Sequence, residues 1–209
     1  MKKYFYGYKR KNGTIGIRNK LLIISITGLT GPTARKISNL LQGSLFVDNP
    51  YGGGIIGDDK IRQDNAIIGF AKNPNIGAIL IITADPPKGH YIKSALDNSK
   101  KPVELLTLDE CNHDAIKLLD LGLRVGAKLT KHISNYRREK VPFSELTIGL
   151  ECGRSDPSSG LVANPLMGLI ADRLIDLGGS AIIGETIEWL GAEHLLQKRA
   201  QSNEVTTKI

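Results

Sequence analysis

The chain has 209 residues, 41% of them hydrophobic and 23% charged, so it is long enough to bury the core of one large or two small domains. The formal net charge is +7, but aromatic residues make up only 5% and no helix-turn-helix, zinc-finger or RNA-binding signature is present, which argues against a nucleic-acid partner. Cys111 and Cys152 lie far apart and outside metal-ligand pair spacing, which excludes a disulfide framework and favours a reducing cytoplasm.

The apolar run at residues 21–26 follows basic residues but is not typical of a signal peptide. It is short, it lies behind a long polar lead, and no clear cleavage site follows it. No other run approaches the roughly 18 apolar residues that a membrane span requires. We therefore expect neither export nor membrane insertion.

Apolar runs alternate with amphipathic stretches along the chain. Strands are expected at 21–26, 44–47, 78–82, 103–106, 146–150 and 181–183. Helices are expected between them, at 33–41, 59–71, 91–97, 109–134, 165–177 and 188–199. This alternation predicts an α/β fold with a mainly parallel sheet and helices on both faces, and right-handed crossovers favour a Rossmann-like, doubly wound arrangement.

A highly charged segment at residues 135–141 is followed by Pro142 and is the expected domain boundary. We predict a Rossmann-like α/β domain over 1–140. The remainder, 141–209, is predicted to be the start of a second α/β domain.

Positive charge is concentrated at the beginning of the chain. The first 47 residues contain nine Lys and Arg residues and no Asp or Glu. Such a basic segment either forms a solvated face or binds an anionic metabolite, an acidic partner surface or nucleic acid. Of these partners, nucleic acid is the weakest choice for the reasons given above.

Two further segments carry polar groups at the expected ends of strands. Asp48 ends the second expected strand, and Asp58 and Asp59 begin the helix after it. Their oxygens are a candidate site for Mg²⁺ or Mn²⁺, the alternative being that Asp58 only caps the helix. The glycine-containing segment 27–33 matches neither the dinucleotide fingerprint nor a P-loop, so no nucleotide cofactor is expected.

The connection between the fifth expected strand and the next helix is the most informative stretch. It offers a thiol, hydroxyls, a carboxylate and flexible backbone amides at the carboxyl end of a strand, where open α/β sheets bind ligands. Pro165 suits the first position of a helix. The alternative is an ordinary strand-to-helix connection with Asn164 as the cap.

This stretch also carries a resemblance to a known family. It runs Gly149-Leu-Glu-Cys-Gly-x-Ser-Asp-x-x-Ser-Gly-x-x-Ala-Asn-Pro165, and Glu185-Thr-x-Glu188-x-x-Gly-Ala-Glu193 comes later. Earlier matches are Gly7-Tyr-Lys-Arg-x-Asn-Gly-x-x-Gly-Ile-Arg-Asn19 and Tyr51-Gly-x-x-x-x-Gly-Asp-Asp59. In this order the motifs resemble the altronate/galactarate dehydratases, sugar-acid hydro-lyases to which sulfolactate sulfo-lyase is related.

The resemblance implies elimination of water from a small anionic sugar acid to give a 2-keto-3-deoxy acid. Glu185 and Glu188 are the candidate acid and base, which such a reaction needs on either side of the reacting carbons. The candidate substrate-binding residues are Arg18, Asn19, Cys152, Gly153, Arg154, Ser155, Asp156 and Asn164. Arg154 replaces a family glycine, so it either grips the substrate or blocks the pocket.

The chain departs from the family where metal chemistry would be expected. The related enzymes carry cysteines where this chain has Leu29, Gly53 and Pro86, and a histidine where it has Asn49. Thiolate and imidazole suit iron, whereas the remaining carboxylates suit harder ions. The departures therefore predict an altered or absent metal site with weak or no binding of iron. Any divalent ion that binds, Mg²⁺ or Mn²⁺ before Fe²⁺, is expected on oxygen ligands.

The alternative function is a non-catalytic or split-subunit module that needs a partner chain, because the family's proteins continue further. Apolar residues of the last expected helix, Trp189, Leu190, Leu195 and Leu196, would then lack cover. We therefore expect a homo-oligomer or a partner subunit. By itself the chain is expected to turn over altronate or galactarate slowly.

Overall fold

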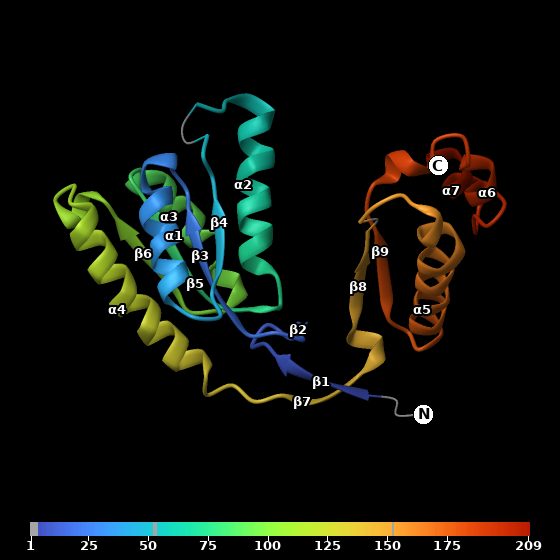
Figure 1. Cartoon of the computed structure of the whole chain (residues 1–209), viewed down its shortest axis with the longest axis horizontal. Helices are drawn as coiled ribbons and strands as arrows, with labels where there is room; N and C mark the ends of the chain where they lie inside the picture. The colour runs from blue at the N-terminus through green and yellow to red at the C-terminus, as the bar shows by residue number, and fades with distance from the viewer. Residues whose placement is uncertain (1–3, 52–53, 152) are drawn as a thin grey trace. The chain divides into compact units, whose positions relative to one another are not determined.

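The computed structural model describes residues 4–51, 54–151 and 153–209 (Figure 1). The chain forms two compact units, residues 5–141 and residues 142–209, the second together with Tyr4. They divide between Val141 and Pro142, at the end of the charged segment. Each unit has its own strands and helices.

The first unit contains a four-stranded sheet. Its strands are β3 (Lys20–Ser25), β4 (Leu45–Asp48), β5 (Ile76–Thr83) and β6 (Val103–Thr107). They lie in the order β4-β3-β5-β6, and all neighbours are parallel. Every residue of β5 is buried, as expected for a continuous apolar run covered on both faces. The predicted α/β fold with a parallel sheet is confirmed.

Four helices cover this sheet. They are α1 (Gly31–Leu40), α2 (Gly57–Lys72), α3 (Pro86–Ser94) and α4 (Ala115–Ile133). Successive strand residues point to opposite faces, so Leu21 and Ile23 join one core cluster with α1 and α4, while Leu22 and Ile24 join another with α2 and α3. The sheet is therefore packed between two layers of helices.

A second, small sheet was not expected from the sequence. It contains β1 (Tyr4–Lys9), β2 (Ile15–Gly16) and β7 (Glu139–Pro142) in the order β2-β1-β7, with β1 and β2 antiparallel. The nearly buried Arg10 ties this sheet to the rest of the unit, because its guanidinium donates to Pro74 O at 2.8 Å and to Arg18 O at 2.9 Å. Burial lowers the pKa of Arg10 from its usual value.

Short 3₁₀ turns complete the connections at Gly28–Thr30, Asp97–Ser99, Asp109–Cys111 and Phe143–Glu145. Cys111 is fully buried as a free thiol, and burial raises its pKa, so it acts as a small apolar side chain. Among the helices in the described ranges, none combines the length and apolar character needed to cross a bilayer.

The second unit is built on a parallel strand pair, β8 (Thr147–Leu150) and β9 (Ser180–Ile183). The helix α5 (Asn164–Asp176) connects them. A 3₁₀ turn, Thr186–Trp189, and two short helices, α6 (Glu193–Gln197) and α7 (Asn203–Lys208), follow.

The α-helix expected to begin near Asn164 does begin there, with Pro165 in its first turn, but further helical backbone that was not expected precedes it. Helical backbone begins at Pro157, and a π-helical segment, Ser159–Ala163, leads into α5. Asp156 is the actual cap, since its Oδ1 accepts from Ser158 N at 2.8 Å. Pro165 has no N–H and its ring crowds the preceding turn, so the wider π turn lets the helix continue through it.

Three other expected helices have different boundaries in the structure, in each case because of a capping side chain or a glycine. The expected helix 188–199 is interrupted, because Gly191 adopts φ 83 between the 3₁₀ turn and α6. The expected helix 91–97 begins earlier, at Pro86, because the Asp85 side chain accepts from Lys88 N. Asp114 caps α4 in the same way, so the main helix begins at Ala115 rather than near residue 109.

Candidate functional site

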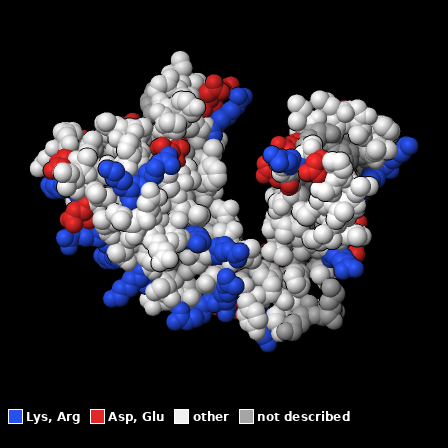
Figure 2. Space-filling view, in the orientation of Figure 1, with Lys and Arg blue, Asp and Glu red and all other residues white. Residues whose placement is uncertain are grey.

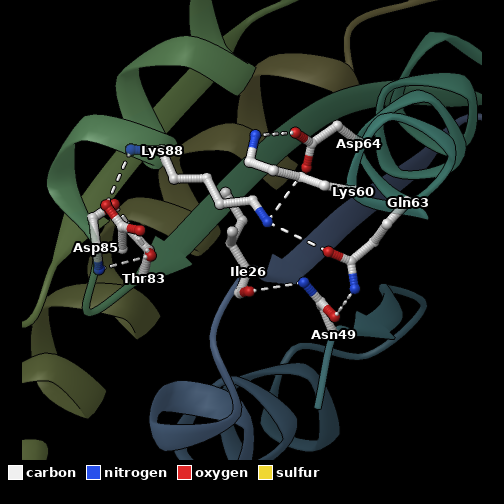
Figure 3. Close-up of polar contacts among 8 residues, drawn as sticks. All are labelled: Ile26, Asn49, Lys60, Gln63, Asp64, Thr83, Asp85 and Lys88. Atoms are coloured by element: carbon white, nitrogen blue, oxygen red, sulfur yellow. Dashed lines mark hydrogen bonds and ion pairs between the residues drawn. The ribbon is translucent and has the colours of Figure 1, made fainter. Parts of the chain in front are cut away.

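Polar side chains converge at the carboxyl edge of the four-stranded sheet (Figure 3). Lys88 of α3 places its Nζ 3.2 Å from Asp64 Oδ1 and 3.3 Å from Gln63 Oε1. Gln63 donates to Asn49 Oδ1, and Asn49 donates to Ile26 O at 2.9 Å. The network thus connects α2 and α3 to the ends of β3 and β4.

This network is largely buried and its charges are paired with one another. The side chains of Lys88 and Asp64 are only 9% and 4% exposed, and Lys60 lies 3.0 Å from the other Asp64 oxygen. The hydrogen bond to Asp64 raises the pKa of Lys60. Because buried charges are tolerated only when paired, two ammonium groups hold one ionised carboxylate here. The arrangement fixes the loops and leaves these groups little access to a ligand.

The crevice between the ends of β3 and β5 is also bridged by protein atoms. Thr27 Oγ1 accepts from Ala84 N at 3.0 Å, so the loops after the two strands are joined. Leu29, in the first of these loops, is 73% exposed, and Pro86 is the first residue of α3. Gly53 lies outside the described residues. Of the three positions at which the related enzymes carry cysteines, the structure therefore describes two: Leu29 is exposed to solvent, and Pro86 lies in the first turn of α3.

The three carboxylates expected to hold a metal do not form a set. Asp58 and Asp59 are exposed in the first turn of α2, and Asp59 pairs with Arg62 at 3.4 Å. Asp48 is 4.0 Å from Arg35. Across the described ranges, no three His, Cys, Asp or Glu side chains are grouped so that they could hold a metal ion. These residues do not fit a shared metal centre.

Asp48 has a different neighbour, the start of α1. One of its oxygens, Oδ1, is buried and has no hydrogen-bond partner among the described atoms. A Cβ on Gly31 would lie 2.9 Å from this oxygen, so only glycine lets the carboxylate come so close to the helix. The positive end of the helix dipole stabilises a carboxylate in this position.

Arg18 and Asn19 lie at the opposite, amino edge of the sheet. Asn19 uses both ends of its amide in the fold: Oδ1 accepts from Arg10 at 2.8 Å and Nδ2 donates to Ile133 O at 2.7 Å. Arg18 is exposed. Within this unit the structure does not bring either residue to the carboxyl edge where Lys88 and Asp64 lie.

In the second unit, two expected site segments do come together. β8 and β9 are parallel neighbours, and Gly184 N donates to Leu150 O at 2.9 Å just beyond their ends. A Cβ on Gly184 would lie 3.9 Å from Glu151 Cγ. The loop after β8 and the loop carrying Glu185 therefore leave the same edge of the sheet side by side.

Glu185 has an unusual backbone. It adopts φ 54 and ψ 55, the left-handed region, which costs a non-glycine residue about 1–2 kcal/mol. Its side chain is exposed at the carboxyl end of β9. Strain of this kind is often retained where it aims a functional side chain. Glu188 follows in the 3₁₀ turn, and its side chain lies outside what the structure describes.

The loop after β8 is exposed and is organised by its own polar groups. Ser158 Oγ and N both donate to Asp156 and lower the pKa of this carboxyl, which therefore stays ionised. Ser159 Oγ donates to Arg154 O at 2.6 Å. Gly153 and Ser155 are exposed beside them. Cys152 lies outside the described residues.

Two further polar residues border this edge. Asn164 is exposed in α5, after the π-helical segment. The backbone N–H groups of Glu193 itself and of Gly191 lower the pKa of the Glu193 carboxyl. It is thus held ionised at the start of α6, where a carboxylate also complements the helix dipole.

Comparison with known proteins identifies the family of both units. Residues 7–134 match the model of the D-galactarate dehydratase/altronate hydrolase second domain, and residues 143–209 match that of the D-galactarate/altronate dehydratase C-terminal domain. The chain belongs to the galactarate/altronate dehydratase family. The resemblance of its motifs is thereby confirmed.

Individual relatives agree with this result. The chain is 31% identical over 205 residues to the (2R)-sulfolactate sulfo-lyase subunit beta of Chromohalobacter salexigens, covering 98% of this chain and 52% of the relative. It is 32% identical over 218 residues to the altronate dehydratase of Bacillus subtilis, covering 98% and 43%. For the galactarate dehydratase of Escherichia coli the identity is 25% over 226 residues, covering 98% and 43%. The chain thus spans about half the length of the curated relatives it matches.

Proposed function

We propose that this chain carries part of the active site of a sugar-acid dehydratase of the altronate/galactarate type. The observation that supports this most directly is the convergence of the Glu151–Asp156 loop and the Glu185 loop at one edge of the second unit. Both belong to segments matched by the family's C-terminal model. The described residues of both loops are exposed, so a substrate can reach them.

The proposed reaction removes water from a small hydroxy acid. A base takes the proton next to the carboxylate, the electron pair forms a carbon–carbon double bond, and the hydroxyl on the next carbon leaves as water with a proton from an acid. The resulting enol becomes the 2-keto-3-deoxy acid. We assign the acid and base roles to Glu185 and Glu188.

Charge placement within the second unit fits this assignment. Asp156 is ionised and occupied as a helix cap, so it is less suited to exchange protons than Glu185. Arg154, together with backbone N–H groups of its loop, can hold the substrate carboxylate and the negative charge that develops on it. Asn164, at the turn after the π-helical segment, offers an amide to a substrate hydroxyl.

We also propose that the first unit is a doubly wound, Rossmann-like domain. Its order β4-β3-β5-β6 reverses direction at β3 and β5, with helices on both faces. In such sheets the reversal point marks the ligand crevice, and here the Thr27–Ala84 hydrogen bond spans it. This domain would then support the fold of the whole protein with its usual ligand crevice closed.

The decisive assay follows 2-keto-3-deoxy acid formation from a panel including altronate and galactarate. It compares the wild type with Glu185→Gln and with a matched control, Glu204→Gln, which changes an exposed glutamate paired with Lys208. We expect Glu185→Gln to reduce turnover at least about a hundredfold. Equal turnover in Glu185→Gln and Glu204→Gln would show that Glu185 has no catalytic role.

A second proposal concerns a partner chain. In the second unit Leu161, Leu166, Leu169, Ile182 and Ile183 are each more than half exposed. Leu166 and Leu169 are one turn apart in α5 and so share one side of this helix, and an exposed apolar face of this kind marks an interface. Because the chain spans about half of its relatives, and one relative is named as a subunit beta, we propose that the half of the family protein not matched by this chain covers this face.

The partner proposal is tested by mixing. The part of the Bacillus subtilis altronate dehydratase that this chain does not match is produced separately and combined with the 209-residue chain. We expect a 1:1 complex by light scattering and a gain in turnover, both lost in Leu166→Asp. If the chain instead forms a stable homodimer that does not bind the added half, a second copy of this chain covers the face.

A further inference from the structure

The amino edge of the first unit contains a cavity of about 540 Å³. Its wall comes from the start of β3, the residues before β4, the last turn of α4 and the residues before β7. It lies at the opposite end of the strands from Lys88 and Asp64, and it belongs wholly to the 5–141 unit. We call it the amino-edge pocket; the residues used below to define it are Tyr8, Arg18, Lys20, Ser134, Arg137 and Arg138.

The charged residues of the amino-edge pocket are all cations. Arg18 and Lys20 come from the start of the chain and Arg137 and Arg138 from the end of the unit, and no Asp or Glu lines the cavity. In the described part of the chain, none of the four pairs with a carboxylate. Figure 2 shows Lys and Arg side chains gathered over the lower part of this unit. The fold thus collects positive charge here without neutralising it.

Arg138 is held in place at the rim. Its guanidinium lies 5.2 Å from the centre of the Tyr8 ring, and its Nη2 donates to Ile17 O at 3.1 Å, across 121 positions of sequence. A guanidinium has five N–H donors, so several remain for a ligand. An arginine already fixed by an aromatic ring loses less conformational entropy when it binds.

Arg137 lies close to the C-terminal end of α4, where the backbone carbonyl groups carry partial negative charge. The carbonyl groups at the C-terminus of α4 would repel an anion, but Arg137 Nη1 donates to Ser134 O at 2.7 Å and offsets their charge. Lys20 approaches from the other side, beside Gly43, since its Nζ would lie 3.9 Å from a Cβ there. Cations therefore face the cavity from two sides.

A second, smaller pocket that shares Tyr136 with the amino-edge pocket is also lined by cations. Lys101 lies behind Tyr136 in a smaller adjoining pocket with Lys9, Lys11 and Lys100. Burial, assisted by the nearby Arg10, lowers the pKa of Lys101 to about 8. The cationic neighbourhood thus extends beyond the four residues of the amino-edge pocket.

We propose that the amino-edge pocket binds a small anion of the phosphate class that carries more than one negative charge, either inorganic or as a phosphate ester. Three arginines suit phosphate oxygens because a guanidinium can bind two of them at once. The cavity volume is within the range of small-molecule sites. The pocket is lined by residues of the first unit and by none of those given a role in the proposed dehydration, so its test does not depend on that activity.

The experiment is calorimetric titration of the 209-residue chain. Pyrophosphate and glucose 6-phosphate test the two sources of phosphate, galactarate tests a dicarboxylate, and a 20-base-pair duplex DNA tests nucleic acid. The variants are Arg137→Gln/Arg138→Gln and Lys20→Gln. The matched control is Lys117→Gln, an exposed lysine of α4 about 20 Å along the helix from Thr130.

We expect one site per chain for pyrophosphate, glucose 6-phosphate or both. The double variant weakens binding at least about tenfold and Lys20→Gln by a smaller factor, while Lys117→Gln leaves it unchanged. If the double variant unfolds, as judged by circular dichroism, Lys20→Gln alone carries the comparison. The proposal is overturned if neither phosphate compound binds, if galactarate or DNA binds more tightly, or if Lys117→Gln weakens binding as much as the pocket variants.

Discussion

Lys88 Nζ lies 3.2 Å from Asp64 Oδ1, and both side chains are almost completely buried at the carboxyl edge of the sheet. The two residues come from different helices, α3 and α2, so their ion pair joins elements that the sequence separates. Removing one partner of such a pair leaves a charge without its counter-ion in a place that water does not reach.

We therefore expect Lys88→Met to lower the free energy of unfolding by about 3 kcal/mol, measured by urea denaturation. Lys60→Met is the matched control, since Lys60 contacts the same carboxylate but is about half exposed, and it should cost no more than about 1 kcal/mol. Equal losses in the two variants would show that burial of the pair does not matter. Lys88→Met/Asp64→Leu should recover much of the loss, because the charge then left without its carboxylate is that of Lys60, which is about half exposed to water.

The second prediction concerns Lys101. Its pKa in the folded chain is about 8, below the usual 10.5, so folding is penalised wherever this amine is charged. The penalty is complete below pH 8 and disappears as the pH rises from 8 to 10.5, so stability should increase over this window. After allowance for solvent screening, the gain is about 1–2 kcal/mol.

Urea denaturation at pH 7.5 and pH 10 measures this effect. The difference between the two pH values in wild type should shrink in Lys101→Met but not in Lys72→Met, an exposed lysine of α2. Other groups that change their charge between these two pH values contribute equally to all three proteins. A pH response that is unchanged in Lys101→Met would contradict the assignment.

The third prediction compares two glycines. Gly69 lies in α2 with no atom near the position of a Cβ, so Gly69→Ala should stabilise the chain by about 0.5–1 kcal/mol through helix propensity alone. Gly16 faces the Pro74 carbonyl so closely that a Cβ would overlap the backbone. Gly16→Ala should therefore destabilise by about 1–3 kcal/mol. Melting temperatures that move in the same direction for both would refute this.

The fourth prediction separates stability from function at Glu185. Glycine adopts the left-handed conformation without strain, so Glu185→Gly should stabilise the second unit by about 1 kcal/mol while removing the proposed acid or base. His113→Gly, at φ 58 in the first unit, should stabilise without affecting turnover. If Glu185→Gly keeps full turnover in the dehydratase assay, its carboxylate has no catalytic part.

The strands of both units could be predicted because each is a short apolar run between polar turns. The small sheet β2-β1-β7 could not, since Tyr4–Lys9 mixes aromatic and polar residues and pairs with a strand near residue 140. The continuous helix expected at 188–199 failed because one glycine, Gly191, takes a positive φ. The α-helix that contains Pro165 was predicted, but the π-helical segment before it was not, because a π turn before a proline leaves no simple sequence pattern.

The candidate site was predicted only in part. The loop after β8 and the Glu185 segment were found from their position after apolar runs and from family motifs, and β8–β9 pairing brings them together. The Lys88–Asp64 pair was missed, because its partners are 24 positions apart and only the packing of α2 against α3 makes them neighbours. The spacing of Lys60 and Asp64, four residues apart on one helix, was the one local feature of the sequence that could have indicated this network.

The pairing of β1 with β7 has a consequence for how the chain is made. The strand Tyr4–Lys9 hydrogen-bonds to one that begins only at Glu139, so it must wait until almost all of its unit has been synthesised. At usual rates of synthesis this delay is roughly ten seconds or more. During that time β3, β4, β5 and β6 can already pair with one another, whereas β1 still awaits β7, so in this interval a chaperone has access to the aromatic side chains of β1 and not to a completed sheet.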